Sequence, residues 1–278
     1  MVVSDQQASN LIKDLGGGLV LRGADPSDSE QLSAFNARVH TEDDDGQPDE
    51  RISQWTHDLI KRPHPATSTA DFTIVEDLNS KQIISTMVLI SQAWSYAGIE
   101  FKVGRPELVG TDPAYRERGL VRAQFDAIHD WSAERGELVQ GITGIPYYYR
   151  QFGYEMGMEL GGGKVGFIQQ IPKTDGEEHC TLRLATDDDI PFLFELYLHG
   201  SQRYLVSCVR DEQTWRDEIR GRRPKNVINS VLIMIVWVSG GPVGVVARPP
   251  DWGGGMMAAA SYEFYPGVWW GWVRPGVR

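Results

Sequence analysis

The sequence has few cysteines, no long hydrophobic run and no leader-like start. Its two cysteines, Cys180 and Cys208, do not stand at a metal-ligand spacing, which favours a reduced, cytoplasmic protein without a metal site. The longest apolar run, Val231 to Val238, is far shorter than the roughly 20 residues of a membrane-spanning helix, and it predicts a buried strand. The N-terminal segment MVVSDQQASN lacks the basic start and apolar centre of a signal peptide.

Basic charge is also scarce. The chain has 27 Lys and Arg against 38 Asp and Glu, so its net charge is -11 and its pI is about 5.0. Nucleic acids and anionic membrane surfaces are bound by basic patches, so this balance argues against both as partners and suits a cationic small molecule. The 278 residues favour two domains over one, and a hydrophobic fraction of 41% is enough for real cores.

One stretch, Leu108 to Tyr154, organises the chain. It opens with a short apolar strand that ends at Asp112, and a basic turn containing a glycine, Arg116 to Val121, follows. Apolar residues then recur at helical spacing as far as Trp131, so the turn opens a helix. Gly136 is expected to end this helix, because glycine is common just past the last turn.

The start of that helix predicts an anion site. The first helical N–H groups have no partner inside the helix, and the helix dipole places partial positive charge there. Gly119 lets a phosphate approach the backbone, and Arg116, Arg118 and Arg122 add full charges around it. A diphosphate is the natural ligand. The alternative is an ordinary loop with solvated arginines, since short glycine motifs often match by chance.

Beyond the helix, the sequence predicts a second strand over Leu138 to Thr143. A short aromatic helix is then expected from Pro146 to near Gly153. It contains the segment YYRQFGY, Tyr148 to Tyr154, which completes the organising stretch.

The whole stretch resembles the GCN5-related N-acetyltransferases (GNAT), in which a strand, a pyrophosphate loop and a helix hold acetyl-CoA. The family loop reads Arg or Gln, two residues, Gly, one residue, then Gly or Ala; Arg116 and Gly119 fit, and Val121 departs from the last position. The second family signature is an aromatic, a Tyr, three residues, Gly and an aromatic, and Tyr148 to Tyr154 fits it throughout. The stretch is similar to the enhanced-intracellular-survival (Eis-like) branch in two segments, RGL in the loop and YRQFGYE after it. That branch carries two acetyltransferase domains and then a sterol-carrier-like domain.

This resemblance implies an α/β (α+β) GNAT fold, with a mixed central sheet flanked by helices, and acetyl-CoA as co-substrate. A backbone N–H of the strand before the loop would polarise the thioester carbonyl in the manner of an oxyanion site. The implied acetyl-CoA contacts are Val109, Gly110, Thr111, Arg116, Glu117, Arg118, Gly119, Leu120, Val121, Arg122, Gly144 and Ile145.

Two residues are expected to move protons. Tyr149 stands at the family's proton-donor position, and a phenol with a reference pKa near 10 is protonated at neutral pH. Its neighbours Tyr148 and Tyr154 are interpreted as packing aromatics. Glu107, expected just before the strand, is the candidate base; Asp112 is the weaker alternative and is interpreted as a surface acid. In Eis-like enzymes the base is thought to be the chain's own C-terminal carboxylate, which has no counterpart here.

The rest of the first half fits one α/β domain, expected over residues 1–171, with a loose lead-in over residues 1–18. A capped helix is expected after Asp25, and a second one over Glu50 to Lys61. Trp55, Trp94, Tyr96 and Phe101 could line an acceptor pocket or could equally belong to the core. The other expected strands are Leu19–Arg22, Phe72–Glu76, Ile83–Ile90 and a closing strand at Val165–Ile168.

The second half, residues 180–278, repeats the beginning. Leu182 to Thr186 echoes Leu21 to Asp25, and a helix capped by Asp187 to Asp189 follows. The copy stops at Arg278, where its own phosphate loop would begin, so it is expected to hold no acetyl-CoA. An uncovered sheet edge in this copy makes a homo-oligomer conceivable.

The leading interpretation is an acetyl-CoA-dependent N-acetyltransferase. It would pass the acetyl group to a primary amine of a small acceptor by direct attack in a ternary complex. The alternative is a catalytically idle GNAT fold used as a CoA-sensing or protein-interaction module. Tyr149 and the three loop arginines favour the enzyme, and the shortened second copy favours the module.

Overall fold

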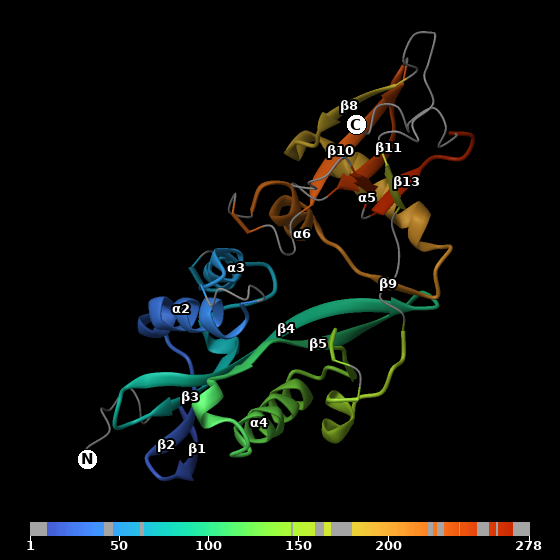
Figure 1. The fold of residues 1–278 in the computed structure, drawn as a ribbon. Helices are drawn as coiled ribbons and strands as arrows, with labels where there is room; N and C mark the ends of the chain where they lie inside the picture. The colour runs from blue at the N-terminus through green and yellow to red at the C-terminus, as the bar shows by residue number, and fades with distance from the viewer. Residues whose placement is uncertain are drawn as a thin grey trace. The chain divides into compact units, whose positions relative to one another are not determined.

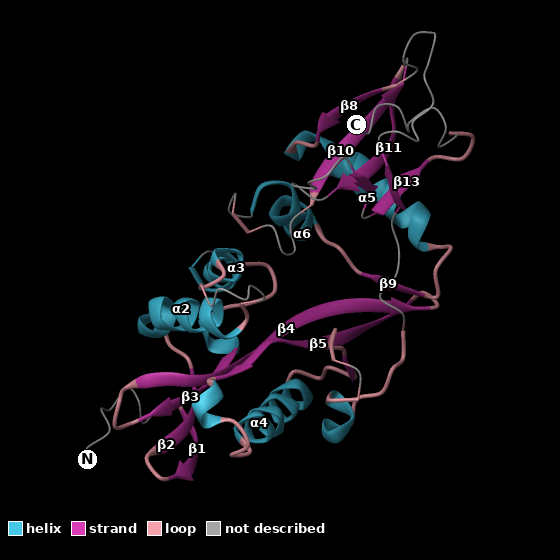
Figure 2. Cartoon of the chain, in the orientation of Figure 1, coloured by secondary structure: helices cyan, strands magenta, loops and turns pink. Residues whose placement is uncertain are grey.

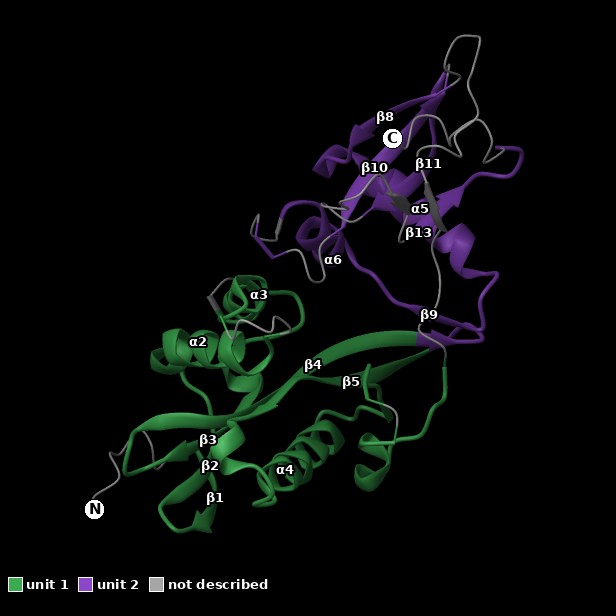
Figure 3. Ribbon diagram, viewed as in Figure 1, with its two compact units in different colours: residues 1–94, 100–159 green, residues 95–99, 160–278 purple. Residues whose placement is uncertain are grey.

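The chain forms two compact units, which Figure 3 colours separately: residues 1–94 with 100–159, and residues 95–99 with 160–278. The computed structural model describes residues 10–41, 47–61, 64–145, 147–158, 164–167, 180–221, 225–226, 231–238, 240–248, 256–259 and 261–268.

The first unit is built on a mixed sheet with the strand order β1-β2-β3-β4-β5-β6. The ladders β1–β2, β2–β3 and β3–β4 are antiparallel, and the short ladder β5–β6 is parallel, in the register Val103↔Val139 and Gly104↔Gln140. The strands are β1 (Leu11–Gly16), β2 (Leu19–Gly23), β3 (Phe72–Asp77), β4 (Gln82–Tyr96), β5 (Ile99–Thr111) and β6 (Val139–Gln140).

Helices cover both faces of this sheet, with α2 (Ser29–Val39) and α3 (Glu50–Lys61) on one face and α4 (Leu120–Glu134) on the other (Figures 1 and 2). A short 3-10 turn, η1 (Pro26–Asp28), precedes α2, and Asp25 caps it by accepting the Ser27 N–H at 2.7 Å. The other short turns are η2 (Thr69–Asp71), η3 (Pro113–Tyr115) and η4 (Tyr149–Phe152). None of the described helices is long and apolar enough to cross a membrane.

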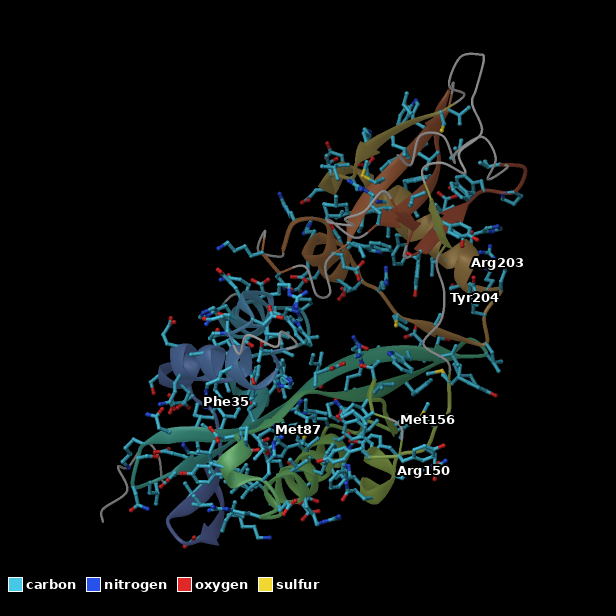
Figure 4. All side chains as sticks on the ribbon, viewed as in Figure 1. Phe35, Met87, Arg150, Met156, Arg203 and Tyr204 are labelled. Carbon is cyan, nitrogen blue, oxygen red and sulfur yellow. The ribbon has the colours of Figure 1, made fainter. Side chains whose placement is uncertain are left out.

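The side chains of β5 alternate between two apolar cores, one on each face of the sheet. Leu108 packs with α2 and α3, next to Phe35, whereas Val109 packs on the α4 face with Met87 and Phe125. Figure 4 labels Phe35 on α2 and Met87 on β4. Because side chains alternate across a strand, the end of β5 is fixed by apolar contacts on both of its faces.

Several boundaries differ from the sequence-based expectation. The lead-in contains a strand, β1, because Leu11–Gly16 pairs with β2 through the turn at Gly17 and Gly18. The strand expected from Leu108 is the last part of the longer β5, so Glu107 lies within that strand and not before it. The strand expected over Leu138 to Thr143 is reduced to β6, and η4 begins only at Tyr149; Pro146 lies outside the described residues.

The second unit contains a sheet with the order β13-β11-β10-β8, all of whose ladders are antiparallel. Its helix α5 (Ile190–Ser201) packs through Ile190 and Leu193 against Trp215 of α6 (Glu212–Arg216). A 3-10 turn, η6 (Asp187–Asp189), precedes α5, and a π-helix, η7 (Asp217–Gly221), follows α6. The strands of this sheet are β8 (Thr181–Leu184), β10 (Leu232–Val238), β11 (Gly241–Arg248) and β13 (Ser261–Phe264), and β9 (Val206–Cys208) lies outside it and pairs with β4.

The strand expected to close the first domain, Val165–Ile168, falls in the second unit instead, and Ile168 lies outside the described residues. Its residues form β7 (Lys164–Phe167), which pairs antiparallel with β12 (Met256–Ala259) in the second unit. The sequence could not show this because short apolar strands carry no mark of the strand they pair with.

An Arg–Asp pair recurs at the start of each unit's first capped turn. Both Nη atoms of Arg22 donate to the Asp28 carboxylate, at 2.7 and 2.8 Å, and both Nη atoms of Arg183 donate to Asp189 in the same way, at 2.7 and 2.6 Å. In each case the aspartate also accepts a backbone N–H at 2.8 Å, from Asp25 and Thr186 respectively. The two capped turns therefore share one hydrogen-bonding pattern.

Candidate active site

The C-terminal end of β5 has an irregular backbone. Leu108 has φ +51°, in the left-handed region that costs a non-glycine residue about 1–3 kcal/mol. Two residues later, Gly110 has no room for a side chain, because a Cβ there would lie 2.7 Å from Val39 Cγ2 and 3.0 Å from His40 Nε2. The packing of α2 against β5 thus holds this strand end in one conformation.

That conformation turns the backbone groups of Thr111 away from β4. The Gly110 carbonyl accepts from Ser85 Oγ at 3.0 Å, and the Asp112 N–H donates to the Ile84 carbonyl at 2.9 Å, so both groups face β4. Peptide planarity and strand alternation direct the N–H and C=O of Thr111 to the opposite edge. The Thr111 N–H is thus one of the groups from Val109 to Thr111 that were expected to polarise the thioester carbonyl.

Along that edge of β5, the pairing with β6 is short and ends well before Thr111. The registered pairs of β6 with β5 are Val103↔Val139 and Gly104↔Gln140, and the Gly141 N–H still reaches the Gly104 carbonyl at 3.0 Å. Residues 141–145 continue without strand structure. The two chain segments therefore part before β5 reaches Thr111, and this opens an edge next to the implied contacts Gly144 and Ile145.

The turn after β5 is built by local caps. Asp112 accepts the Ala114 N–H at 3.0 Å and also pairs with Arg38 at 2.7 Å, and Tyr115 donates its hydroxyl to Asp77 at 2.8 Å. The hydrogen bond from the Arg38 guanidinium is the main reason that the pKa of Asp112 lies below its usual value. Asp112 is therefore occupied as a cap and ion-pair partner, which makes it an unsuitable base.

The start of α4 is exposed and cationic. Gly119 caps the helix with φ +72°, Glu117 has φ +62°, and nothing lies within 4 Å of the position that a Cβ on Gly119 would take. Leu120 is buried and Val121 is half-buried, so their side chains face the core and only their N–H groups remain for a ligand. The free helix N–H groups and the open approach fit a diphosphate.

Three arginines flank this helix start, and each is tethered on one side. Arg116 donates to the Thr111 carbonyl at 3.4 Å, Arg118 to the Ala114 carbonyl at 3.2 Å, and Arg122 to Gln151 Oε1 at 3.1 Å. Arg118 also lies over the ring of Tyr115 at 4.8 Å. These contacts use few of the donors on each guanidinium, so exposed positive charge is held beside the helix N-terminus.

Tyr149 lies at the edge of the α4-side core. Its ring meets Phe125 edge-on at a centroid distance of 6.0 Å, and it lies so close to Gly144 that a Cβ there would be 2.1 Å from Cε2. Within the described part of the chain, no hydrogen bond to its hydroxyl is formed. Burial, and to a lesser extent the charges of Tyr148 and Glu107, raises the pKa of Tyr149 to about 12.

Glu107 is close enough for its charge to act on that phenol. The side chain is 16% exposed and pairs with Arg105 on the same strand. Burial is the largest influence on this carboxyl and raises its pKa, while Arg105 acts in the opposite direction. A carboxylate with a raised pKa and a protonated phenol therefore stand near the same edge, as paired base and acid do in proton-transfer sites.

The structure adds residues that sequence reasoning missed. His40, at the end of α2, packs on Gly110, and burial lowers the pKa of its ring. Ser85 and Gln124 meet inside the core, between β4 and α4. A single polar residue in an apolar pattern gives no sign of its partner, so no sequence signal could have found these contacts. Of the possible acceptor-pocket aromatics, Trp55 packs in the core of α2 and α3.

With this geometry in place, comparison with known proteins identifies the first unit. Residues 21–157 match the family model described as an acetyltransferase (GNAT) domain. These residues form a GNAT domain. None of the curated proteins compared matches the sequence. The sequence-based expectation of a GNAT fold is confirmed for this unit, and its mixed sheet carries helices on both faces as expected.

Solved structures resemble the chain in fold. A probable N-acyltransferase from Enterococcus faecalis is 14% identical with a TM-score of 0.57, and the match covers 82% of this chain and 54% of that one. N-myristoyltransferase from Saccharomyces cerevisiae, solved with bound myristoyl-CoA, is 12% identical with a TM-score of 0.61 and coverages of 93% and 66%. A GCN5-related N-acetyltransferase from Anabaena variabilis is 14% identical, with a TM-score of 0.59 and coverages of 93% and 61%. The chain thus spans less than two thirds of each of these proteins.

Proposed function

We propose that this protein is an acetyl-CoA-dependent N-acetyltransferase that acts on a primary amine of a small, cationic acceptor by direct attack in a ternary complex. The observation that carries the proposal is the meeting of three features around the end of β5. They are the cationic start of α4, the outward-facing N–H of Thr111, and Tyr149 with Glu107 at the same edge. The GNAT domain and the acyl-CoA bound by a neighbour of similar fold support it.

In this mechanism α4 and its arginines hold the cofactor. The N–H groups at the start of the helix and the exposed sides of Arg116, Arg118 and Arg122 bind the diphosphate. Acetyl-CoA supplies an activated acyl group and a thiol leaving group. The N–H of Thr111 or Val109 polarises the carbonyl, as a preorganised donor does in an oxyanion site.

Tyr149 and Glu107 divide the proton transfers. Glu107 takes a proton from the attacking amine nitrogen, directly or through a water, and its raised pKa strengthens it as a base near neutral pH. The phenol of Tyr149, with a pKa of about 12, keeps its proton in the free enzyme and gives it to the departing sulfur. Overall, one C–N bond forms and one C–S bond breaks. One proton leaves the amine nitrogen, and one proton is added to the sulfur of the leaving thiol.

The acceptor is proposed to be cationic because the whole chain carries a net charge of -11. The Eis-like tandem arrangement is part of the same proposal, with the second unit as a second GNAT-like copy. The matching Arg22–Asp28 and Arg183–Asp189 pairs support it. We also propose a cytoplasmic location, which fits a cofactor that is available inside the cell.

A calorimetric titration with acetyl-CoA tests the cofactor site. Gly119→Glu places a carboxylate where the diphosphate is proposed to bind, and Gly119→Gln is the matched control with the same size and the same backbone strain. The glutamate variant should bind acetyl-CoA at least about tenfold more weakly than the glutamine variant, because only it opposes the phosphate charge. Equal affinity of the two variants, close to that of the parent, would show that the diphosphate lies elsewhere.

A further inference from the structure

A chain of buried hydrogen bonds joins α4 to the end of β5. Ser85 Oγ lies 2.6 Å from Gln124 Oε1, and it also lies 3.0 Å from the Gly110 carbonyl and 2.8 Å from Thr111 Oγ1. On its other side, Gln124 Nε2 donates to the carbonyl and the hydroxyl of Thr73, both at 3.2 Å. We call Ser85 and Gln124 the polar relay.

The polar relay lies in the fully buried core, where apolar side chains are the usual occupants. Ser85, Gln124 and Thr73 are each 0% exposed, and Phe125, the residue after Gln124 on α4, is buried in an apolar cluster with Met87. A buried amide must find partners for both ends, or its burial costs about 1–3 kcal/mol. The Nε2 end of Gln124 donates to Thr73, and its Oε1 accepts from Ser85 when the Ser85 proton points that way, so the relay gives the core a specific geometry as well as volume.

The polar relay connects the two elements that form the proposed site, α4 and the end of β5. Gln124 belongs to α4, whose N-terminus is proposed to bind the diphosphate, and Ser85 contacts the Gly110–Thr111 peptide, whose N–H points away from β4 toward the proposed thioester position. The Ser85 hydroxyl has one proton and can give it to Gln124 or to Gly110. When the proton goes to Gln124, Ser85 Oγ can still accept from the Thr111 hydroxyl, and when it goes to Gly110, Ser85 bonds the Gly110 carbonyl directly. The Gly110–Thr111 segment is held in both orientations.

We propose that Ser85 and Gln124 are positioning residues that align the Thr111 N–H with an acyl-CoA held at the start of α4. This inference rests on the proposed function. Neither side chain touches the substrate; both act through the backbone of β5. A small displacement of a polarising donor lowers the rate, because a shift of about 1 Å costs up to 10²-fold in turnover.

The same strand offers a matched control. Thr86, next to Ser85, is 0% exposed, and in the described part of the chain its Oγ1 has no hydrogen-bond partner. It points to the opposite face of the sheet, because neighbouring side chains in a strand alternate. Thr86→Val therefore removes one buried hydroxyl from β4 and leaves the relay intact.

The test compares Ser85→Ala, Ser85→Thr and Thr86→Val with the parent. The readouts are kcat, the KM for acetyl-CoA, and the infrared band of the thioester carbonyl in bound, carbonyl-labelled acetyl-CoA. Ser85→Ala should lower kcat by about 10- to 100-fold with little change in KM, less than the ~10²–10³ of losing a donor outright. Its carbonyl band should return toward that of free acetyl-CoA. Ser85→Thr should restore both properties, and Thr86→Val should leave both unchanged.

If Ser85→Ala is too unstable to assay, the double variant Ser85→Ala with Gln124→Met replaces both polar partners by apolar groups, which is close to neutral for stability. It should show the same loss of kcat and the same band. A parent-like kcat and an unchanged band in either variant would overturn the positioning role while the proposed function stands. A parent that binds acetyl-CoA but shows no amine-dependent turnover would overturn the proposed function, and this inference with it.

Discussion

The ring of Tyr149 lies against the backbone of Gly144, so closely that a Cβ on Gly144 would be 2.1 Å from Cε2 of the ring. Phe125 and Tyr148 hold the ring from other sides, at centroid distances of 6.0 and 5.1 Å. Gly144 thus lets the segment after β6 pass next to the proposed acid, and it fixes the side from which the hydroxyl approaches the edge of β5.

The first prediction concerns this contact. Gly144→Ala should force the Tyr149 ring to move, which lowers the free energy of unfolding by about 1–3 kcal/mol, as overpacking usually does. It should also lower kcat, since the proton donor is displaced. Denaturant unfolding and steady-state kinetics measure the two effects.

Gly141→Ala is the matched control on the same segment. A Cβ at Gly141 would lie 3.4 Å from Trp94 Cη2, which is ordinary contact, so this variant should differ little from the parent. Equal effects of the two alanine substitutions would mean that the closeness of Gly144 to Tyr149 has no special role.

The second prediction separates Tyr149 from its neighbour. Tyr149→Phe keeps the ring and removes only the hydroxyl, so turnover should fall by about 10²–10⁴-fold, the range of general acid catalysis, while acetyl-CoA affinity is preserved. Tyr148→Phe should lose far less. If both variants acetylate at the parent's rate, Tyr149 is a packing residue and the sulfur takes its proton from another group.

The third prediction is a pH dependence. Burial raises the pKa of Glu107 above its usual value, and a base must be ionised, so kcat/KM should rise with pH through a midpoint above about 4.5, the ordinary value. Glu107→Gln should lower kcat and abolish this limb. Tyr149, with a pKa of about 12, should cause no fall in rate up to pH about 10. A Glu107→Gln variant with an unchanged pH profile would exclude Glu107 as the base.

The same carboxyl should affect stability. Because its folded pKa is raised, the folded state binds the proton more tightly than the unfolded state does. The contribution of Glu107 to stability is therefore present at low pH and is lost as pH rises from its unfolded pKa through its folded pKa. Urea titrations in this window should show a fall in unfolding free energy for the parent that Glu107→Gln lacks; parallel pH curves would contradict this.

Much of the fold could be predicted because its signals are local. The helix Glu50–Lys61 was expected with these bounds, and Gly119 and Gly136, with φ +72° and +69°, begin and end α4 as glycines at those positions should. The motif around Tyr149 placed η4 and its glycine cap, Gly153, for the same reason.

What could not be predicted depends on contacts between distant segments. The strand end at Thr111 is fixed by Val39 and His40 on one side and by Ser85 on the other, and a single sequence does not show which residues meet. Burial likewise decides the pKa of Glu107, and the sequence does not reveal how deeply a carboxyl within a strand is buried.

The central claim is acetyl transfer to an amine, and one measurement tests it most directly. The protein is incubated with acetyl-CoA and a panel of primary amines, cationic and neutral, while thiol release and the acetylated product are followed by absorbance and mass spectrometry. The account predicts amine-dependent thiol release with one acetylated amine per thiol, fastest for cationic amines. Tight acetyl-CoA binding with no release above the uncatalysed rate for any amine would contradict it and would favour a CoA-sensing module.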